Sequence, residues 1–149
     1  MTIIIATPHH VLCEIALAAI GKGKHVLAEK PVAMNEREAA RIEETAAQAG
    51  ICCMAGYSLR FFIAQKQVYD LVEAGVVGEM QAVTAGMGTG PLGGWCAKAE
   101  MGGGALLYLG SHLVDEILLH ENRFQAGFAP IDLSTHNQPR PLETGGYDC

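Results

Sequence analysis

A lysine at the end of an apolar run is the first residue of this sequence that could take part in chemistry. Lys30 comes shortly after the apolar residues 26–28, and Pro31 follows it directly. Proline cannot continue the ladder of a sheet, and it restricts the preceding residue to an extended backbone. Because ligands of open α/β sheets bind at the carboxyl ends of strands, this amine is placed to meet a ligand. The tetrapeptide 28–31 alone, however, favours a solvated lysine in a turn.

A second group of reactive side chains shares one face of a helix predicted at about 104–119. Tyr108, His112, Asp115 and Glu116 are three or four residues apart, and residues at this spacing are neighbours on a helix surface. Imidazole titrates near neutral pH, so a positioned His112 can accept or donate a proton. For this segment alone, a histidine satisfied by Asp115 or Glu116 is the simpler interpretation.

Strand and helix patterns alternate over the first part of the chain, and these elements must position Lys30. A continuous β-branched run at 3–6 predicts a strand that is buried on both faces of a parallel sheet. The other predicted elements are a helix at 11–20, a strand at 26–28, a helix from Asn35 to Gly50 and a strand at 51–55. Short helices between strands favour parallel pairing. Residues 1–56 therefore predict half of a doubly wound α/β domain.

The second predicted helix carries signals at both of its ends. Asn35 is a preferred N-cap residue, and Glu38 stands at the third helical position, as in a capping box. Acidic residues in the first turn suit the positive end of the helix dipole. Gly50 readily adopts the left-handed conformation in which many helices end. These residues predict where the helix begins and where it ends.

Composition limits the classes of protein to which the chain can belong. Its 149 residues are the length of one ordinary domain, and 50% of them are apolar, enough for a core. Its net charge is −6, and it lacks the basic cluster that a nucleic acid partner requires. No apolar run approaches the ~20 residues of a membrane span, and Met1 leads directly into a strand pattern. The sequence predicts a cytoplasmic protein that binds neither nucleic acid nor membrane.

The cysteines do not form a metal-binding pattern. They are Cys13, Cys52, Cys53, Cys96 and Cys149. None of their spacings is C-x-x-C, and adjacent residues of a strand point to opposite faces. An odd number of cysteines without an export signal favours buried or free thiols in a reducing compartment. We expect no metal site.

Several motifs together carry a resemblance to one enzyme family. They lie at 2–10, 25–31, 56–61, 75–79 and 102–115, and they include ATPHH, HVLAEKP and GGGALLYLGSHLVD. In order and spacing they resemble the family of glucose–fructose oxidoreductase and inositol dehydrogenase, nicotinamide-dependent enzymes that act on sugars and polyols. The resemblance covers residues 2 to about 120. It implies a partial Rossmann sheet followed, over 57–120, by the start of an α+β substrate domain.

The resemblance implies hydride transfer between a nicotinamide cofactor and a carbinol substrate. Such a reaction needs a cation near the carbinol oxygen and a base for its proton. The family pattern places Lys30 in the first role and His112 in the second. Where this chain has Tyr108, the commonest family pattern has an aspartate. A phenol can donate a hydrogen bond to a substrate oxygen, but Tyr108 could equally be a packing residue.

Cofactor contacts also follow from the resemblance. Thr7, Pro8 and His9 would contact NAD or NADP at the end of the first strand. Glu29 would fix the nicotinamide side of the site or pair with Lys30.

Two further residues are predicted to contact ligands by the same resemblance. Arg60 would lie at the mouth between the domains, where it would bind ribose or substrate oxygens or form a surface salt bridge. Trp95 would stack on a sugar ring or cover the core.

The sequence also predicts that the chain is incomplete. A complete dinucleotide-binding domain opens with a strand that runs into G-x-G-x-x-G at a helix N-terminus, followed by an acidic residue for the ribose. The chain offers no such opening unit, and a two-domain relative would be roughly twice as long. Residues 121–149 are polar, with several prolines and glycines, and predict an irregular or disordered tail, either frameshifted or simply divergent.

Three functions remain open from the sequence. The first is an oxidoreductase that acts on a sugar or polyol. The second is a glycoside hydrolase of the same fold that uses NAD transiently. The third is an inactive fragment that cannot bind cofactor. The substrate and the choice between NAD and NADP do not follow from these residues, and the resemblance implies that full-length relatives form homo-oligomers.

Overall fold

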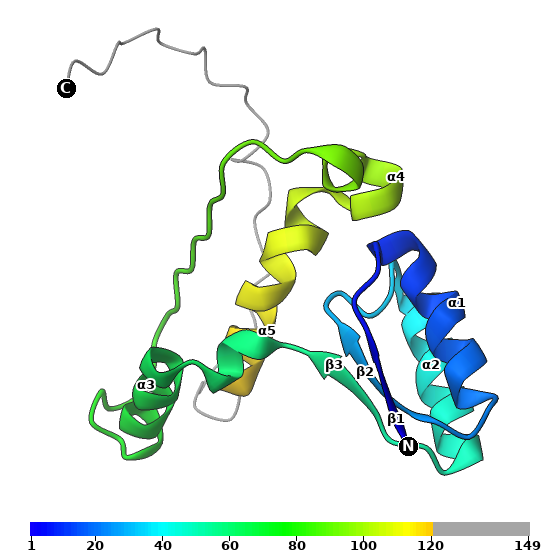
Figure 1. Ribbon diagram of the computed structural model, residues 1–149. Coiled ribbons are helices and arrows are strands. Elements are labelled where there is room, and N and C mark those ends of the chain that lie inside the picture. The colour runs from blue at the N-terminus through cyan, green and yellow to red at the C-terminus, as the bar shows by residue number, and fades with distance from the viewer. Residues whose placement is uncertain (121–149) are drawn as a thin grey trace, which may run out of the picture.

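Two helices pack on the same side of a three-stranded parallel sheet (Figure 1). The computed structural model describes residues 1–120. The sheet consists of β1 (Thr2–Ile5), β2 (His25–Glu29) and β3 (Cys53–Gly56) in that order, connected by α1 (His9–Ile20) and α2 (Glu36–Ala49). Both strand pairs are parallel. The predicted α/β class is therefore confirmed, and each predicted element of this part is present.

The core lies between the sheet and these two helices. Ile5, Val26 and Ala28 of the sheet are almost fully buried, as are Leu12 and Ile20 of α1. Side chains alternate between the two faces of a strand, so the buried residues of the sheet all belong to one face. Removal of apolar surface from water is the main stabilising term in such a layer. This layer holds the carboxyl ends of β1 and β2 in place.

The opposite face of the sheet is largely open. Ile4, Leu27 and Met54 form one row across the three strands, and Ile4 is 73% exposed and Met54 47%. The prediction that the strand at 3–6 is buried on both faces is therefore wrong for the described part of the chain. The physical reason is that α1 and α2 both lie on the other side of the sheet (Figure 1), so that Ile4 and Met54 are exposed and Leu27 is only half-buried.

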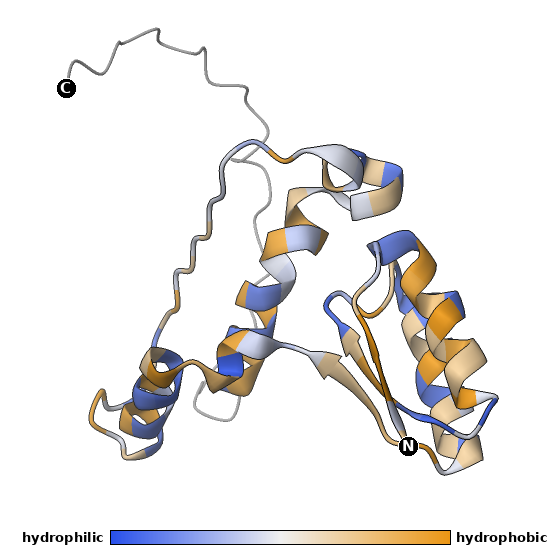
Figure 2. Cartoon of the chain, in the orientation of Figure 1, coloured by the Kyte–Doolittle hydropathy of each residue, from blue (hydrophilic) through white to orange (hydrophobic). Residues whose placement is uncertain are grey.

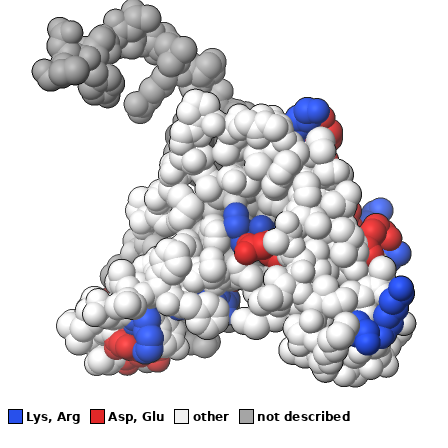
Figure 3. Space-filling view, in the orientation of Figure 1, with Lys and Arg blue, Asp and Glu red and all other residues white. Residues whose placement is uncertain are grey.

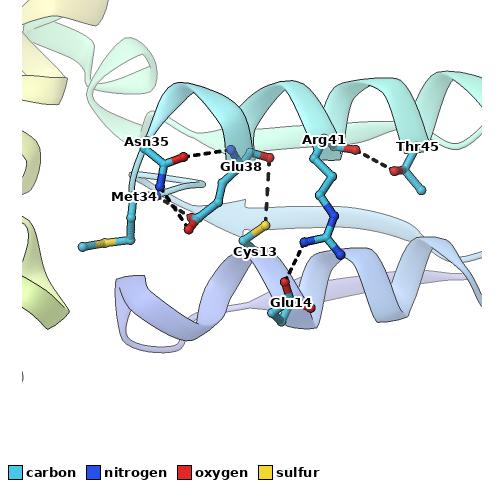
Figure 4. A network of polar contacts seen from close by, with 7 residues as sticks. All are labelled: Cys13, Glu14, Met34, Asn35, Glu38, Arg41 and Thr45. Carbon is cyan, nitrogen blue, oxygen red and sulfur yellow. Dashed lines mark hydrogen bonds and ion pairs between the residues drawn. The ribbon is translucent and has the colours of Figure 1, made fainter.

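The N-terminus of α2 is held by a network of hydrogen bonds (Figure 4). The Oδ1 atom of Asn35 accepts from the backbone N–H of Glu38 at 3.0 Å. The Glu38 carboxylate accepts from the backbone N–H of Met34 at 2.9 Å and from the Asn35 side-chain amide at 3.1 Å. At the other end Gly50 is left-handed, with φ of 64°. Both predicted end signals are confirmed, although the carboxylate reaches the residue before the cap.

Replacing Asn35 with alanine is expected to lower the free energy of unfolding by about 1 kcal/mol, because the N–H of Glu38 loses its acceptor. An Asn35→Asp chain keeps an oxygen at the same position and should retain most of the stability. Urea denaturation of the three chains measures the difference. Equal midpoints for the alanine and the original chain would show that this cap does not stabilise α2.

The chain after β3 consists of helical segments and extended stretches. These are a 3-10 turn at Ser58–Phe61, α3 at Ile63–Glu73, a 3-10 turn at Gly94–Ala97, α4 at Ala99–Gly102, a π-helical turn at Leu106–Gly110 and α5 at Ser111–Leu119. Within residues 57–120 the structure has no strand, so the β part of the expected substrate domain stays a prediction. The tail expected at 121–149 lies outside the described residues.

The turn before α3 and the start of α3 include hydrophobic residues (Figure 2), and three of these residues are exposed. Phe61 is 70% exposed, Phe62 56% and Ile63 80%. On the face shown in Figure 3, charged side chains are few and lie mainly at the margins, with one group near the centre. Contiguous apolar surface of this kind favours association with another apolar surface. In the described part of the chain, no helix combines the length and the apolarity that crossing a bilayer requires.

Candidate functional site

A pocket lies at the carboxyl ends of β1 and β2. Its volume is about 210 Å³, and it is lined by Ala6, Thr7, His9, Glu29, Lys30, Trp95 and Tyr108. Residues from the strand ends thus meet residues that lie far later in the sequence. Pro8 precedes the first residue of α1, next to this wall, whereas Arg60 and His112 do not line the pocket. The structure therefore brings together most, but not all, of the side chains predicted to contact ligands.

Lys30 connects the end of β2 to the later part of the chain. Its Nζ donates a hydrogen bond to the carbonyl oxygen of Tyr108 and lies 4.8 Å from the centre of the tyrosine ring. Desolvation by burial lowers the pKa of Lys30, while the negative charge of Glu29 acts in the opposite direction. A lysine fixed in this way offers a positive charge at a defined point of the pocket wall.

His9 is buried in the same wall, with only 4% of its surface exposed. Its Nδ1 lies 3.0 Å from the carbonyl oxygen of Gly102. The imidazole packs edge-on against the ring of Trp95, with 4.6 Å between the ring centres, and against the ring of Tyr108, with 5.6 Å between the ring centres. Burial lowers the pKa of His9, and the charge of Lys30 acts in the same direction. The lowered pKa favours a neutral imidazole at neutral pH.

Thr7 and Glu29 supply polar atoms at the two strand ends. The Oγ1 atom of Thr7 is buried and has no hydrogen-bond partner among residues 1–120. An unpartnered buried hydroxyl costs about 1–3 kcal/mol, so it indicates a position where a ligand can bond. The carboxylate of Glu29 accepts a hydrogen bond from the backbone N–H of Lys30 at 3.3 Å, whereas both of its predicted roles, the contact with nicotinamide and the pairing with the Lys30 side chain, stay predictions.

Tyr108 lies in a wide helical turn, and His112 lies in the α-helix that follows it. Residues Leu106–Gly110 form a π-helical turn that leads into α5, and such turns are frequent at functional sites. A π-helical turn advances fewer degrees per residue than an α-helix, which changes how residues four apart are aligned. Tyr108 lines the pocket, whereas the His112 ring packs against Tyr57 at 6.3 Å. The single face predicted from the spacing is therefore divided between two environments.

His112 lies outside the pocket wall but remains under the influence of Lys30. Its Nδ1 is buried and has no hydrogen-bond partner in the described part of the chain. Burial and the charge of Lys30 lower the pKa of His112, and the carboxylates of Asp115 and Glu29 act in the opposite direction. A neutral imidazole with an unpartnered nitrogen has the properties of a base. The catalytic role of His112 stays a prediction.

The hydroxyl of Tyr108 is held in its protonated form. A hydrogen bond with Cys96 is the main cause that raises the pKa of Tyr108. The phenol also contacts Trp95, at 6.4 Å between the ring centres. A protonated phenol can donate a hydrogen bond to a substrate oxygen. Its contacts with Trp95, His9 and Lys30 mean that Tyr108 is also a packing residue of this wall.

Arg60 forms an ion pair instead of lining the pocket. Its guanidinium makes two hydrogen bonds to the carboxylate of Asp115, one of 2.7 Å from Nε. Asp115 is 6% exposed, and the Arg60 guanidinium lies 5.9 Å from the centre of the Tyr57 ring. Arg60 also lines a separate hollow of about 310 Å³, with Tyr57 and β3 residues. Arg60 therefore forms an ion pair, although with a buried partner rather than at the surface, and its contact with ribose or substrate oxygens stays a prediction.

One glycine motif was not among the predicted functional residues. Gly88, Gly90 and Gly93 have the spacing G-x-G-x-x-G. They lie in a segment without strand or helix, which leads into a four-residue 3-10 turn. A pyrophosphate turn needs a strand before the glycines and a helix N-terminus after them. The spacing alone could have suggested a dinucleotide motif, and the structure of this segment excludes that role.

The cysteines of the described residues are free thiols. They are Cys13, Cys52, Cys53 and Cys96; Cys149 lies outside the described residues. Within residues 1–120, no three His, Cys, Asp or Glu side chains gather as they would around a metal ion. Cys96 is next to the pocket residue Tyr108 and raises the pKa of that tyrosine. No spacing in the sequence pointed to that contact.

Two histidines with lowered pKa values predict how the free energy of unfolding depends on pH. The folded pKa values of His9 and His112 lie below the ordinary value of 6.5. Between that value and the lowered pKa values, the unfolded chain binds more protons, so the free energy of unfolding falls as the pH falls below 6.5. Burial raises the pKa of Glu116. This shift has the opposite effect, because the folded chain then binds more protons than the unfolded chain and the free energy of unfolding rises as the pH falls.

Variants separate these contributions. Urea denaturation at about pH 7.5 and pH 5.5 should show a smaller loss of stability for a His9→Asn, His112→Asn chain than for the original chain. His10→Asn serves as the control, because His10 is exposed. An unchanged pH dependence in the double variant would mean that the two imidazoles titrate alike in the folded and unfolded chains.

The chain is similar in sequence to known oxidoreductases. Residues 1–57 match the family model described as an oxidoreductase family with an NAD-binding Rossmann fold. Levoglucosan dehydrogenase of Pseudarthrobacter phenanthrenivorans is 30% identical over 97% of this chain and 38% of its own length. The chain therefore spans less than half the length of the curated relatives that it matches.

Solved structures that resemble this chain are also proteins that bind NAD or NADP. An NAD-binding protein from Listeria innocua has a TM-score of 0.67 and 30% identity, over 78% of this chain and 35% of that protein. A 3-ketoreductase from Actinomadura kijaniata, solved with NADP and TDP-benzene, has a TM-score of 0.65 and 30% identity, over 82% of this chain and 37% of its own. Residues 1–57 therefore belong to the Gfo/Idh/MocA family of oxidoreductases with an NAD-binding Rossmann fold.

Proposed function

We propose that the chain forms the nicotinamide and substrate end of an NAD(P)-dependent oxidoreductase that acts on a sugar or polyol. One observation carries this proposal: the amine of Lys30, at the end of β2, meets Tyr108 and Trp95 in a pocket that also contains Thr7 and His9. A cation, hydroxyl groups and aromatic rings are the groups that a polyhydroxylated ligand requires.

The strand-end residues fit the nicotinamide part of a dinucleotide. Thr7 offers a buried hydroxyl without a partner, and ligands of such sheets bind at this edge. We assign cofactor contacts to Thr7, Pro8, His9 and Glu29. The described residues offer no strand, glycine turn and helix in sequence for a pyrophosphate, so the proposal gives this chain only the nicotinamide end. NAD and NADP are both compatible with it.

The chain's own groups then have distinct tasks. A bound nicotinamide dinucleotide supplies the hydride acceptor or donor. Lys30 places its positive charge beside the carbinol oxygen, where it stabilises the negative charge that develops when the proton leaves. Tyr108 keeps its proton and donates a hydrogen bond. To His112, which lies beyond the pocket wall, we assign the base that takes or returns a proton. The reported relatives that are named for a sugar substrate or a ketone reduction support this assignment.

A direct assay tests the proposed function. The purified chain is incubated with NAD⁺ or NADP⁺ and a panel of sugars and polyols that includes levoglucosan and myo-inositol, and the absorbance of reduced nicotinamide is followed. We expect reduced dinucleotide to accumulate with at least one substrate. Hydrolysis of a glycoside without net reduction would contradict the proposal, and so would the absence of any dinucleotide binding in calorimetry.

A further inference from the structure

The orientation of the His9 side chain determines which of its nitrogens can meet a ligand. A backbone carbonyl can only accept a hydrogen bond, so the 3.0 Å contact with Gly102 requires that Nδ1 of His9 carries the hydrogen. In a neutral imidazole the other nitrogen, Nε2, then has the lone pair. The structure thus fixes the tautomer of a buried histidine, 4% of whose surface is exposed.

Neighbouring aromatic rings keep the imidazole from rotating. The ring centre of Trp95 lies 4.6 Å from that of His9, edge-on, and the ring centre of Tyr108 lies 5.6 Å from it. Together with the bond to Gly102, these contacts hold the ring from several directions. A side chain locked in this way has already lost the rotational freedom that binding would otherwise cost.

The electrostatic surroundings keep the ring neutral, and therefore able to accept a hydrogen bond. Desolvation lowers the pKa of His9, and the charges of Lys30 and His10 act in the same direction. The other charged group of the pocket wall is the Glu29 carboxylate, next to Lys30 in sequence. The pocket wall therefore presents the hydrogen-bond donors of Lys30 and a neutral acceptor on His9, beside the hydroxyl groups of Thr7 and Tyr108. This pairing matches a hydroxyl group, which both donates and accepts.

We propose that Nε2 of His9 accepts a hydrogen bond from a hydroxyl group of the sugar or polyol that Lys30 also contacts. His9 is then a substrate-binding residue, in addition to or in place of the cofactor contact that the sequence suggested. This inference rests on the proposed function. It assigns the role to substrate because the two rings that hold His9, Trp95 and Tyr108, come from the later segment rather than from the strand ends.

Two variants of His9 separate ligand binding from structural support. The amide of asparagine overlays Nδ1, so His9→Asn retains the bond to Gly102 and removes the acceptor at Nε2. The amide of glutamine reaches the Nε2 position, so His9→Gln retains an acceptor and loses the bond to Gly102. Loss of one hydrogen bond should raise the Kd for levoglucosan roughly 2- to 12-fold in His9→Asn, and less in His9→Gln. The reverse ranking would mean that His9 only ties the Gly102 segment to α1, and it would overturn the proposal.

Nitrogen NMR of the original chain gives a readout that does not depend on turnover. We expect the His9 ring to be the Nδ1–H tautomer and its Nε2 resonance to shift when levoglucosan is added. An Nε2–H tautomer, or an Nε2 resonance that stays in place with levoglucosan, would overturn the proposal. A shift caused by NADP⁺ alone, without one caused by levoglucosan, would assign the contact to the cofactor and would also overturn it.

The two proposals can fail separately. If levoglucosan shifts the Nε2 resonance but no hydride transfer occurs with any substrate, the proposed function fails and the His9 contact stands. If reduced dinucleotide accumulates at an unchanged KM in the His9→Asn chain, the proposed function stands and the His9 contact fails.

Discussion

A Lys30→Met chain is expected to transfer hydride at least about a hundredfold more slowly than the original chain, because one oriented group that stabilises developing negative charge contributes about that much. Methionine keeps much of the length of the lysine stem but removes its charge. The hydrogen bond from Nζ to the carbonyl oxygen of Tyr108 is lost as well. Steady-state rates with the best substrate of the panel measure the effect.

Two further variants define the cause of that loss. Lys22→Met removes a lysine that is exposed in the turn after α1, and it should leave the rate unchanged. Lys30→Arg keeps the charge but replaces a compact amine by a planar fork, so its rate should lie between the other two. A Lys30→Met chain that retains the original rate would remove Lys30 from the mechanism.

An Arg60→Met chain is expected to lose about 2–3 kcal/mol of unfolding free energy, because the Asp115 carboxylate would remain buried without its partner. The Asp115 side chain is 7% exposed and that of Arg60 is 40% exposed. Solvent therefore screens part of the interaction, and we place the effect below the 3–5 kcal/mol that accompanies loss of one partner from a fully buried pair. Urea denaturation of the variant measures the cost.

A double-mutant cycle tests the explanation. If the unpaired carboxylate is the cause, Arg60→Met combined with Asp115→Leu should be more stable than Arg60→Met alone. Arg41→Met breaks an exposed pair with Glu14, where the side chains are 59% and 71% exposed, and should cost less than ~1 kcal/mol. Equal losses for Arg60→Met and Arg41→Met would show that burial of Asp115 does not govern the energetics.

Local signals were sufficient to predict the elements of the first part of the chain. Asn35 and Gly50 act within one helix, and the bonds that they make involve neighbours a few residues away. The position of Lys30 was predictable for a similar reason, because the carboxyl end of a parallel strand is fixed by topology. The family resemblance then added the partners of Lys30, which no local pattern indicates.

The features that the sequence did not predict depend on distant parts of the chain. The β-branched run at 3–6 indicates a strand, but only the arrangement of α1 and α2 on one side decides that Ile4 is exposed. Spacing placed Tyr108 and His112 on one face, because it assumed a regular α-helix in place of the π-helical turn at Leu106–Gly110. Nothing local distinguishes the acidic residue that pairs with Arg60, which lies 55 positions later.

The hydrogen bond between His9 and Gly102 is another feature that depends on distant parts of the chain. It joins residues 93 positions apart, and a histidine after a strand is compatible with solvent, cofactor or substrate. Only the three-dimensional structure shows that the ring is buried and that one of its nitrogens is already used. The same contact holds the α4 segment, and with it Trp95, against the strand ends. The pocket therefore depends on long-range contacts as much as on the strand that carries Lys30.

On the proposed function, this pocket supports hydride transfer from a carbinol carbon to a nicotinamide. The most direct measurement uses a sugar of the panel with deuterium on its carbinol carbons and determines the mass of the reduced dinucleotide. We predict that the original chain and Lys22→Met transfer deuterium to the dinucleotide, and that Lys30→Met does so far more slowly. Reduced dinucleotide without deuterium, or no reduced dinucleotide with either NAD⁺ or NADP⁺, would contradict the account.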